Sequence, residues 1–292
     1  MRMVAHVKPF RAVLPARVPP ADWSDRIARI RDVRRSGRAG VQQVILDDGQ
    51  QWCLKRHATG GRGRQEFEAM RRAREDGLWG VPAVSQTEQG LLLPWVDGQP
   101  GEAWDRDVAG DAAGWLRALH ALKPRITGDP LSLKEAYQRR WMRLRRILNT
   151  HLDDRSWSRA DHAWRTAWQV AEARTARTPT HGDFLPHNWI VNHGSLQAVI
   201  DFEFARDDIP ERDLARYWLH AGEIGGEDWM AFMEAYGLHG LSSPWLQLAC
   251  LLEAGGTFEV GRNTNDVKLI RLGTVGVQSA SEADNFTALV PA

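Results

Sequence analysis

The sequence HGDFLPHN at residues 181–188 is followed, after a short apolar stretch, by IDFE at residues 200–203. Asp183 and Asn188 are five residues apart, and Asp201 lies eighteen residues after Asp183. Phosphoryl transfer from ATP needs one group that orients the accepting hydroxyl and takes its proton, and others that hold Mg²⁺. The spacing therefore predicts a phosphoryl-transfer site, with Asp183 as the catalytic residue and Asn188 and Asp201 as metal ligands.

A lone aspartate in a loop is more often a turn residue or a helix cap than a catalyst. Here the segments 189–191 and 196–200 are apolar and flank Asn192-His193-Gly194, which is typical of a hairpin turn. Such a hairpin returns Asp201 to the side of the loop that carries Asp183. The combination favours the catalytic interpretation over a simple turn.

Length and composition indicate a globular protein of two lobes. The chain has 292 residues, of which 43% are hydrophobic and 26% charged, and its net charge is +1. This balance argues against a nucleic-acid partner. The charge is unevenly spread, with 17 basic and 11 acidic residues in 1–100 against 6 basic and 16 acidic residues in 178–292. The acidic half is the one that contains the predicted metal ligands.

The remaining composition predicts a cytoplasmic protein without a membrane partner. Two cysteines are too few for a disulfide framework. Residues 1–20 are interrupted by arginines and prolines, unlike the apolar core of a signal peptide. The apolar run around residues 246–252 is far shorter than a membrane span.

The order of predicted elements divides the chain into three parts. Residues 1–25 form an irregular lead-in, residues 26–98 a β-rich lobe with one helix at 65–76, and residues 99–292 a mainly helical lobe. The glycine- and arginine-rich segment 59–64 is predicted to be a solvated loop, with anion binding as the alternative. Among the later helices, one is expected at 244–253, just before Gly255 and Gly256.

The motifs at 181–188 and 200–203 resemble the catalytic and metal motifs of the aminoglycoside phosphotransferase and choline-kinase-like family of small-molecule kinases. The resemblance extends over most of residues 30–280. It implies an α+β, protein-kinase-like bilobal fold, with a small β-rich N-lobe and a larger, mainly helical C-lobe. Gly182 stands where protein kinases usually have arginine, which favours the small-molecule branch.

The resemblance also assigns nucleotide-binding residues. Lys55, on the strand after a hairpin, corresponds to the phosphate-binding lysine, and Glu66 to its acidic partner, with Glu68 as the alternative. The segment 36–40, which contains Gly37 and Gly40, stands where the family covers the nucleotide phosphates. It lacks the Gly-x-Gly-x-x-Gly pattern of protein kinases, so its phosphate contacts stay open.

The segment LLPWVDG at 92–98 resembles the hinge between the lobes. In this family the backbone there binds adenine, which implies the Pro94 carbonyl and the Val96 N–H as partners of the base. An ordinary strand end is the alternative. His181 is expected to brace the catalytic loop, and His187 and Glu203 are candidate substrate-binding or supporting residues.

The predicted activity is the Mg²⁺-dependent transfer of the γ-phosphate of ATP, or of GTP, to a hydroxyl of a small molecule. The favoured acceptor is an aminoglycoside-like or other antibiotic, as in antibiotic resistance, but the sequence leaves open whether the role is resistance, biosynthesis or primary metabolism. Sugars, nucleosides and amino alcohols are alternative acceptors. A catalytically silent nucleotide-binding protein and a protein kinase are the other classes considered. The sequence leaves the oligomeric state open.

Overall fold

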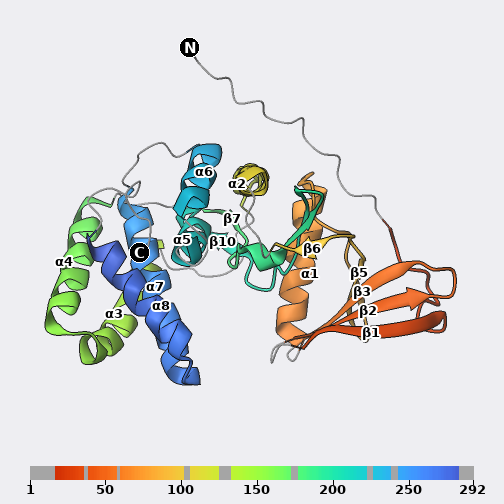
Figure 1. The fold of residues 1–292 in the computed structure, drawn as a ribbon, viewed down its shortest axis with the longest axis horizontal. Helices are drawn as coiled ribbons and strands as arrows, with labels where there is room; N and C mark the ends of the chain where they lie inside the picture. The colour runs from red at the N-terminus through yellow and green to blue at the C-terminus, as the bar shows by residue number, and fades with distance from the viewer. Residues whose placement is uncertain are drawn as a thin grey trace, which may run out of the picture. The chain divides into compact units, whose positions relative to one another are not determined.

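The computed structural model describes residues 17–35, 39–57, 60–101, 106–124, 133–171, 177–221, 226–237 and 243–282. Gly37, residues 1–16 of the predicted lead-in, and Thr59 lie outside these ranges. Two compact units are present: Met1–Gly101 with Asn188–Phe204, and Glu102–His187 with Ala205–Ala292. Figure 1 shows the elements of each unit, and the β8–β9 hairpin belongs to the first unit although it lies late in the sequence.

An antiparallel five-stranded sheet forms most of the first unit. Its order is β1-β2-β3-β5-β4, with bounds Ile27–Arg35, Ala39–Leu46, Gln51–His57, Gly90–Pro94 and Ser85–Thr87. Side chains alternate between the faces of a strand. On β3, Trp52 and Leu54 are accordingly buried in a core with Trp23, Val44 and Leu92. Lys55 is thereby directed to the opposite face of the sheet.

A smaller three-stranded sheet of order β6-β8-β9 completes the strands of the first unit. Its strands are Gln99–Pro100, Trp189–Asn192 and Ser195–Val199. The turn between β8 and β9 has positive φ at His193 (50°) and Gly194 (67°), as a tight hairpin turn requires. Gly98 passes so close to β8 that an added Cβ would lie 2.6 Å from the Val191 carbonyl oxygen. Only glycine fits there.

Helix α1 (Gly60–Glu75) corrects the sequence-based prediction for residues 60–64. These residues were expected to form a solvated loop, but they are the first turns of the helix. Tertiary contacts explain the difference. The Arg62 guanidinium lies 5.0 Å from the centre of the Phe204 ring and 3.5 Å from Glu203. An added Cβ at Gly63 would lie 3.1 Å from the His57 ring, so this glycine leaves room for that side chain, although glycine has a low helix propensity.

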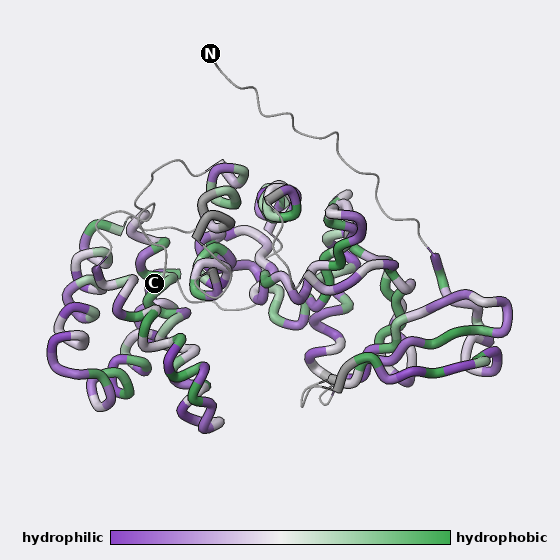
Figure 2. Tube along the Cα trace, viewed as in Figure 1, coloured by the Kyte–Doolittle hydropathy of each residue, from purple (hydrophilic) through white to green (hydrophobic). Residues whose placement is uncertain are grey.

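The second unit is mainly helical, with one short sheet formed by β7 and β10. The elements are α2 (Arg106–His120), α3 (Leu133–His151), α4 (Asp154–Val170), β7 (Thr178–Thr180), β10 (Arg206–Asp208), α5 (Glu211–Ala221), α6 (Gly226–Tyr236), α7 (Pro244–Thr264) and α8 (Val267–Glu282). Figure 2 shows hydrophobic and hydrophilic stretches alternating along these helices, as expected for helices that pack on one side. The single-turn 3₁₀ helix Pro186–Asn188 precedes β8.

Helix α7 is eleven residues longer than the predicted 244–253 and continues through Gly255 and Gly256. An added Cβ at Gly255 would lie 3.2 Å from the Leu144 side chain of α3. On α8, a Cβ at Gly273 would lie 2.4 Å from the Phe258 backbone nitrogen of α7. These glycines therefore allow helix backbones to approach closely, rather than ending a helix.

The predicted α+β class, with a β-rich N-terminal part and a helical C-terminal part, is confirmed. The proposed domain limits 1–25, 26–98 and 99–292 stay a prediction. Within the described ranges, every helix is too short or too polar to cross a bilayer.

Candidate functional site

Lys55 is the centre of an ion-pair cluster in the first unit. Its ammonium nitrogen, Nζ, lies 2.9 Å from Glu66 Oε1 and 2.8 Å from Oε2, and 2.7 Å from Asp201 Oδ1. Burial lowers the pKa of Lys55, but the attraction of Glu66 and Asp201 outweighs it, and the pKa is raised. Lys55 is therefore charged, and its charge is shared between a helix residue and a turn residue. Glu68 instead pairs with Arg71 at the surface.

His57, which sequence reasoning did not single out, supports Glu66 from the same strand as Lys55. Its Nε2 lies 2.7 Å from Glu66 Oε2. Burial raises the pKa of Glu66, but His57 and Lys55 lower it by more than burial raises it. The pKa is therefore lowered overall, and the carboxylate stays ionised. On the other side of the ring, Nδ1 lies 3.7 Å from Glu203 Oε2. Burial and then the nearby Asp201 raise the pKa of Glu203.

Asn188 and Asp201 flank the base of the β8–β9 hairpin. The Ile200 N–H donates to the Asn188 carbonyl at 2.9 Å, so Asp201 follows directly after the residue paired with Asn188. Asp201 has a φ of 69°, a left-handed conformation that few residues other than glycine adopt. Its carboxylate keeps a quarter of its surface exposed, whereas Asn188 is buried.

The donor chemistry of this hairpin base fits Mg²⁺. Carboxylate and amide oxygens are hard ligands, and Mg²⁺ on a nucleotide is usually held by one or two carboxylates, together with phosphate oxygens and water. Within the described ranges, no three His, Cys, Asp or Glu side chains gather as a metal site. A magnesium ion bound together with a nucleotide does not require such a cluster.

The other predicted nucleotide-binding residues lie along the same sheet. Pro94 is the last residue of β5 and pairs with Trp52 of β3, and Val96 follows two residues later; both Pro94 and Val96 are half-buried. Gly40 lies in β2, opposite Arg56 of β3. Gly37 is outside the described residues.

Asp183 lies in the second unit and is held by Arg216 of α5. Arg216 donates to Asp183 Oδ1 from Nε at 3.0 Å and approaches it with Nη2 at 2.9 Å. His187 Nε2 lies 3.8 Å from the other carboxylate oxygen, Oδ2. Burial raises the pKa of Asp183, but His187 and Arg216 together lower it well below the ordinary range. The carboxylate is therefore ionised at neutral pH.

The backbone around Asp183 is fixed by the buried Asp213 of α5. Asp213 accepts hydrogen bonds from the backbone N–H of His181 (2.8 Å) and of Gly182 (2.7 Å). Its Oδ2 also lies 3.1 Å from His120 Nε2. His181 is fully buried, and its Nδ1 accepts from the Asp183 N–H at 3.3 Å. This network determines the course of the loop before Asp183.

The structure thus places the predicted residues in two groups. Lys55, Glu66, Asn188, Asp201 and Glu203 lie together in the first unit, and Asp183, His181 and His187 in the second. The residues that sequence reasoning missed are His57, Arg216 and Glu253.

Only His57 had a signal in the sequence. It lies two residues after Lys55 on one strand, and hence on the same face as Lys55. Arg216 and Glu253, whose side chains lie 3.0 Å apart, are 37 residues apart in the chain, and no pattern links them.

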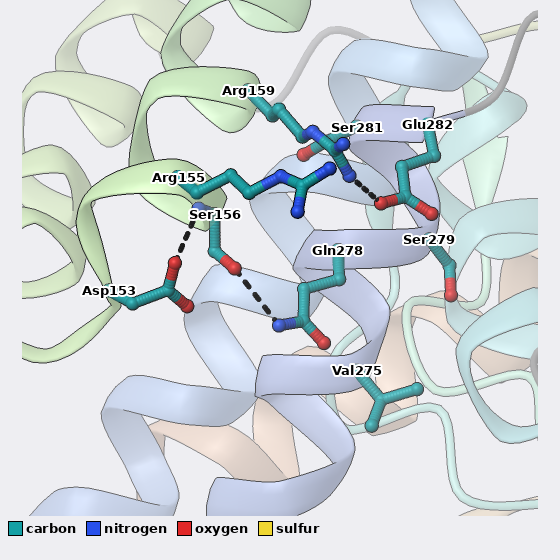
Figure 3. A pocket seen from close by; sticks show the side chains of 9 residues that line it. All are labelled: Asp153, Arg155, Ser156, Arg159, Val275, Gln278, Ser279, Ser281 and Glu282. Carbon is teal, nitrogen blue, oxygen red and sulfur yellow. Dashed lines mark hydrogen bonds and ion pairs between the residues drawn. The ribbon is translucent and has the colours of Figure 1, made fainter.

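A hollow of about 510 Å³ lies elsewhere in the second unit, between the start of α4 and the end of α8. Figure 3 shows Arg159 reaching across it to Glu282, and Gln278 donating to Ser156. The predicted site residues do not line it. It is therefore separate from the candidate site.

Comparison with solved structures shows the fold. The macrolide 2′-phosphotransferase MphH from Brachybacterium faecium aligns with a TM-score of 0.62 and 16% identity, over 85% of this chain and 91% of that chain. The aminoglycoside phosphotransferase APH(4)-Ia, as a thermostable mutant with AMP-PNP and hygromycin B, aligns with a TM-score of 0.70 and 13% identity, over 87% and 94%. The aminoglycoside phosphotransferase APH(2″)-Ib in its ADP-bound form aligns with a TM-score of 0.62 and 16% identity, over 89% of this chain and 96% of that chain.

Comparison by sequence with curated proteins gave no match. A family model, described as the phosphotransferase enzyme family, matches residues 33–249. This range contains both groups of candidate residues and covers about three quarters of the chain. The protein therefore belongs to the phosphotransferase enzyme family.

Proposed function

We propose that the protein transfers the γ-phosphate of ATP, or of GTP, to a hydroxyl of a small molecule, with Mg²⁺ as cofactor. The observation that carries this proposal is the position of Lys55, whose ammonium contacts both Glu66 and Asp201. A lysine placed between a helix glutamate and a metal-binding aspartate is the arrangement that phosphoryl transfer needs on its nucleotide side. Family membership supports the same reaction class.

On the nucleotide side, Lys55 would bind the α- and β-phosphates, while Glu66, supported by His57, holds the lysine in position. Asn188 and Asp201 would bind Mg²⁺, which neutralises charge on the phosphoryl group when bound. The backbone at Pro94 and Val96 would contact the base. Gly40 would lie near the phosphates, and Glu203 would support Asp201.

On the acceptor side, Asp183 would orient the hydroxyl and take its proton late in the reaction. A carboxylate with a lowered pKa is a weak base, which suits a reaction whose transition state needs positioning more than proton removal. His181 and Asp213 would keep the loop rigid. His187, which is partly exposed beside Asp183, would contact the acceptor.

For the acceptor we propose an antibiotic with a free hydroxyl. The acidic balance of residues 178–292 suits a cationic compound such as an aminoglycoside. Part of this charge is matched, because Arg216 pairs with Asp183 and Glu253, and Arg206 with Asp208. Uncharged hydroxyl compounds, such as macrolides and sugars, therefore belong in the same test.

The deciding experiment is a panel of acceptors assayed for Mg²⁺-dependent consumption of ATP and of GTP, with mass spectrometry of the acceptor. Aminoglycosides, macrolides, sugars, nucleosides and amino alcohols form the panel, and Asp201→Asn is the matched control. We expect one class to gain a phosphate with the wild-type protein and not with the control. Nucleotide binding without phosphorylation of any acceptor would instead support a silent nucleotide-binding protein.

A further inference from the structure

We propose that Arg216 is a positioning residue for Asp183: it holds Oδ1 and thereby sets the direction of Oδ2, the oxygen that would accept the hydroxyl proton. Both Nε and Nη2 of Arg216 are directed at Oδ1, at 3.0 Å and 2.9 Å. Two donors saturate the side of that oxygen that faces α5. The inference rests on the proposed phosphotransferase activity and deepens the role given there to Asp183.

Glu253 of α7 holds the far side of the same guanidinium. Arg216 Nη1 donates to Glu253 Oε1 at 3.0 Å, so the planar group is bound at both ends and cannot rotate freely. Arg140 of α3 in turn approaches Glu253 Oε2 at 3.6 Å and donates to the Leu252 carbonyl. Three helices therefore determine where Arg216 points, and through it where Asp183 points.

The charged and titratable groups around Asp183 come from every neighbouring segment. Arg216 and Glu253 belong to α5 and α7, His187 lies 3.8 Å from Oδ2, and His181 accepts the backbone N–H of Asp183. Arg212, one turn before Arg216 on α5, is paired with Asp208. Arg216 is thus the guanidinium that bonds Oδ1. Arg143 of α3, which pairs with Glu259 of α7 at 2.8 Å and is more than half exposed, offers a matched control.

This geometry specifies how the proton moves. The acceptor O–H donates to Oδ2 while its oxygen attacks the γ-phosphorus. The new O–P bond forms as the bond from that phosphorus to the bridging oxygen breaks, and the nucleoside diphosphate leaves with the bonding electrons. The hydroxyl proton passes to Oδ2. Arg216 stabilises the ionised carboxylate before transfer and keeps Oδ2 in line.

The test compares Arg216→Gln with Arg143→Gln in the full chain. For Arg216→Gln we expect turnover to fall by about 10²-fold, the usual cost of a misplaced reacting group, with ATP affinity unchanged. In ¹³C-carboxyl NMR, with Asp183 assigned by comparison with Asp183→Asn, the pKa of Asp183 should rise by about one unit or more. Arg143→Gln, which removes only the pair with Glu259, should leave both the turnover and this titration as in the wild type.

Arg216→Lys keeps the positive charge but removes the planar guanidinium. This variant replaces Arg216→Gln in the test if the glutamine variant fails to fold. We expect it to lose turnover as well, because an ammonium cannot hold both carboxylates in the same geometry. Weaker ATP binding with unchanged turnover would mean that Arg216 binds phosphate, and would overturn the inference. The inference would also be overturned if Arg216→Gln kept both the wild-type turnover and the wild-type pKa of Asp183.

The NMR titration needs no acceptor, which separates this inference from the proposed function. If Asp183→Asn keeps its turnover, the proposed catalytic role fails, whatever Arg216 does. If Asp183→Asn is inactive while Arg216→Gln behaves like the wild type, only the positioning role is wrong.

Discussion

The two units of the molecule each place one cation between two carboxylates. In the first unit, Lys55 contacts Glu66 of α1 and Asp201 of the turn after β9. In the second, Arg216 contacts Glu253 of α7 and Asp183 of the loop after β7. In each set, one carboxylate belongs to a helix and the other is a predicted functional residue.

The difference lies in the cation. A lysine ammonium is a compact charge on a flexible side chain, and it can bond a new partner because its N–H groups require no particular orientation of that partner. An arginine guanidinium is planar and fixes the orientation of the groups it binds. We therefore expect the Lys55 cluster to rearrange when a nucleotide binds and the Arg216 cluster to stay unchanged.

The largest effect is expected for Asp183→Asn. The amide cannot accept the hydroxyl proton, so turnover should fall by about 10²–10⁴-fold. Nucleotide affinity should stay close to wild type, because the proposed nucleotide-binding residues lie in the other unit. Steady-state kinetics and nucleotide titration measure the two quantities. Near-normal turnover would remove Asp183 from the catalytic role.

Glu66→Ala tests the first cluster against its surface neighbour Glu68. Glu66 is buried and pairs with Lys55 and His57, so its loss should lower the free energy of unfolding by about 3 kcal/mol. Glu68→Ala, which breaks pairs with Arg71 and Arg72 at the surface, should have a much smaller effect on the free energy of unfolding. Urea unfolding measures both. Equal effects would contradict the assignment of Glu66 as the partner of Lys55.

Asp213→Asn tests the backbone network beneath Asp183 and should cost about 1–3 kcal/mol at neutral pH. Burial raises the pKa of Asp213, but His120, His181 and Arg212 outweigh it, so its pKa in the folded protein is lowered. The stability from this carboxylate is fully present above the unfolded pKa of about 3.9 and is lost as pH falls through the lower folded pKa.

The prediction for Asp213 is measured as the free energy of unfolding in urea, at pH values from 7 to 3, for the wild type and for Asp213→Asn. Wild-type stability should fall more steeply in the acid range than that of Asp213→Asn. Parallel curves would show that this aspartate is not the group that titrates.

The smallest effects concern glycines within helices, one of them in α8, which packs against α7, the helix that carries Glu253. Gly273→Ala would place a Cβ 2.4 Å from the Phe258 backbone of α7, which should cost about 1–3 kcal/mol. Gly114→Ala, in α2, meets nothing within 4 Å and should stabilise by about 0.5–1 kcal/mol. Thermal unfolding of both variants shows whether each one is less or more stable than the wild type. A neutral Gly273→Ala would mean that α7 and α8 do not depend on this close contact.

Several features of the site follow from local patterns in the sequence. The spacing of Asp183, Asn188 and Asp201 reflects a loop and a tight hairpin, which are determined by neighbouring residues. Lys55 and Glu66 were assigned through a family resemblance, and they lie in contact because a strand leads directly into a helix. His57 could have been found in the same way, from the two-residue period of the strand.

The α1 and α7 boundaries were not predictable in this way. Residues 60–64 are rich in glycine and read as a loop, but Arg62 is anchored by Phe204, far away in the sequence. The predicted helix 244–253 ends before Gly255 and Gly256, whereas α7 continues through them, and an added Cβ at Gly255 would lie 3.2 Å from the Leu144 side chain of α3. In both cases long-range contacts outweigh local propensity.

The sequence by itself determined the family, the α+β class and the residue types of the candidate chemistry, because these depend on motifs of neighbouring residues and on their spacing. The tertiary structure alone decided that Arg216 lies between Asp183 and Glu253, and that Lys55 is shared by two carboxylates. An ion pair forms only when its two charged groups lie close together in space. Residues that are far apart in the sequence reach that distance only after the strands and helices that carry them have packed.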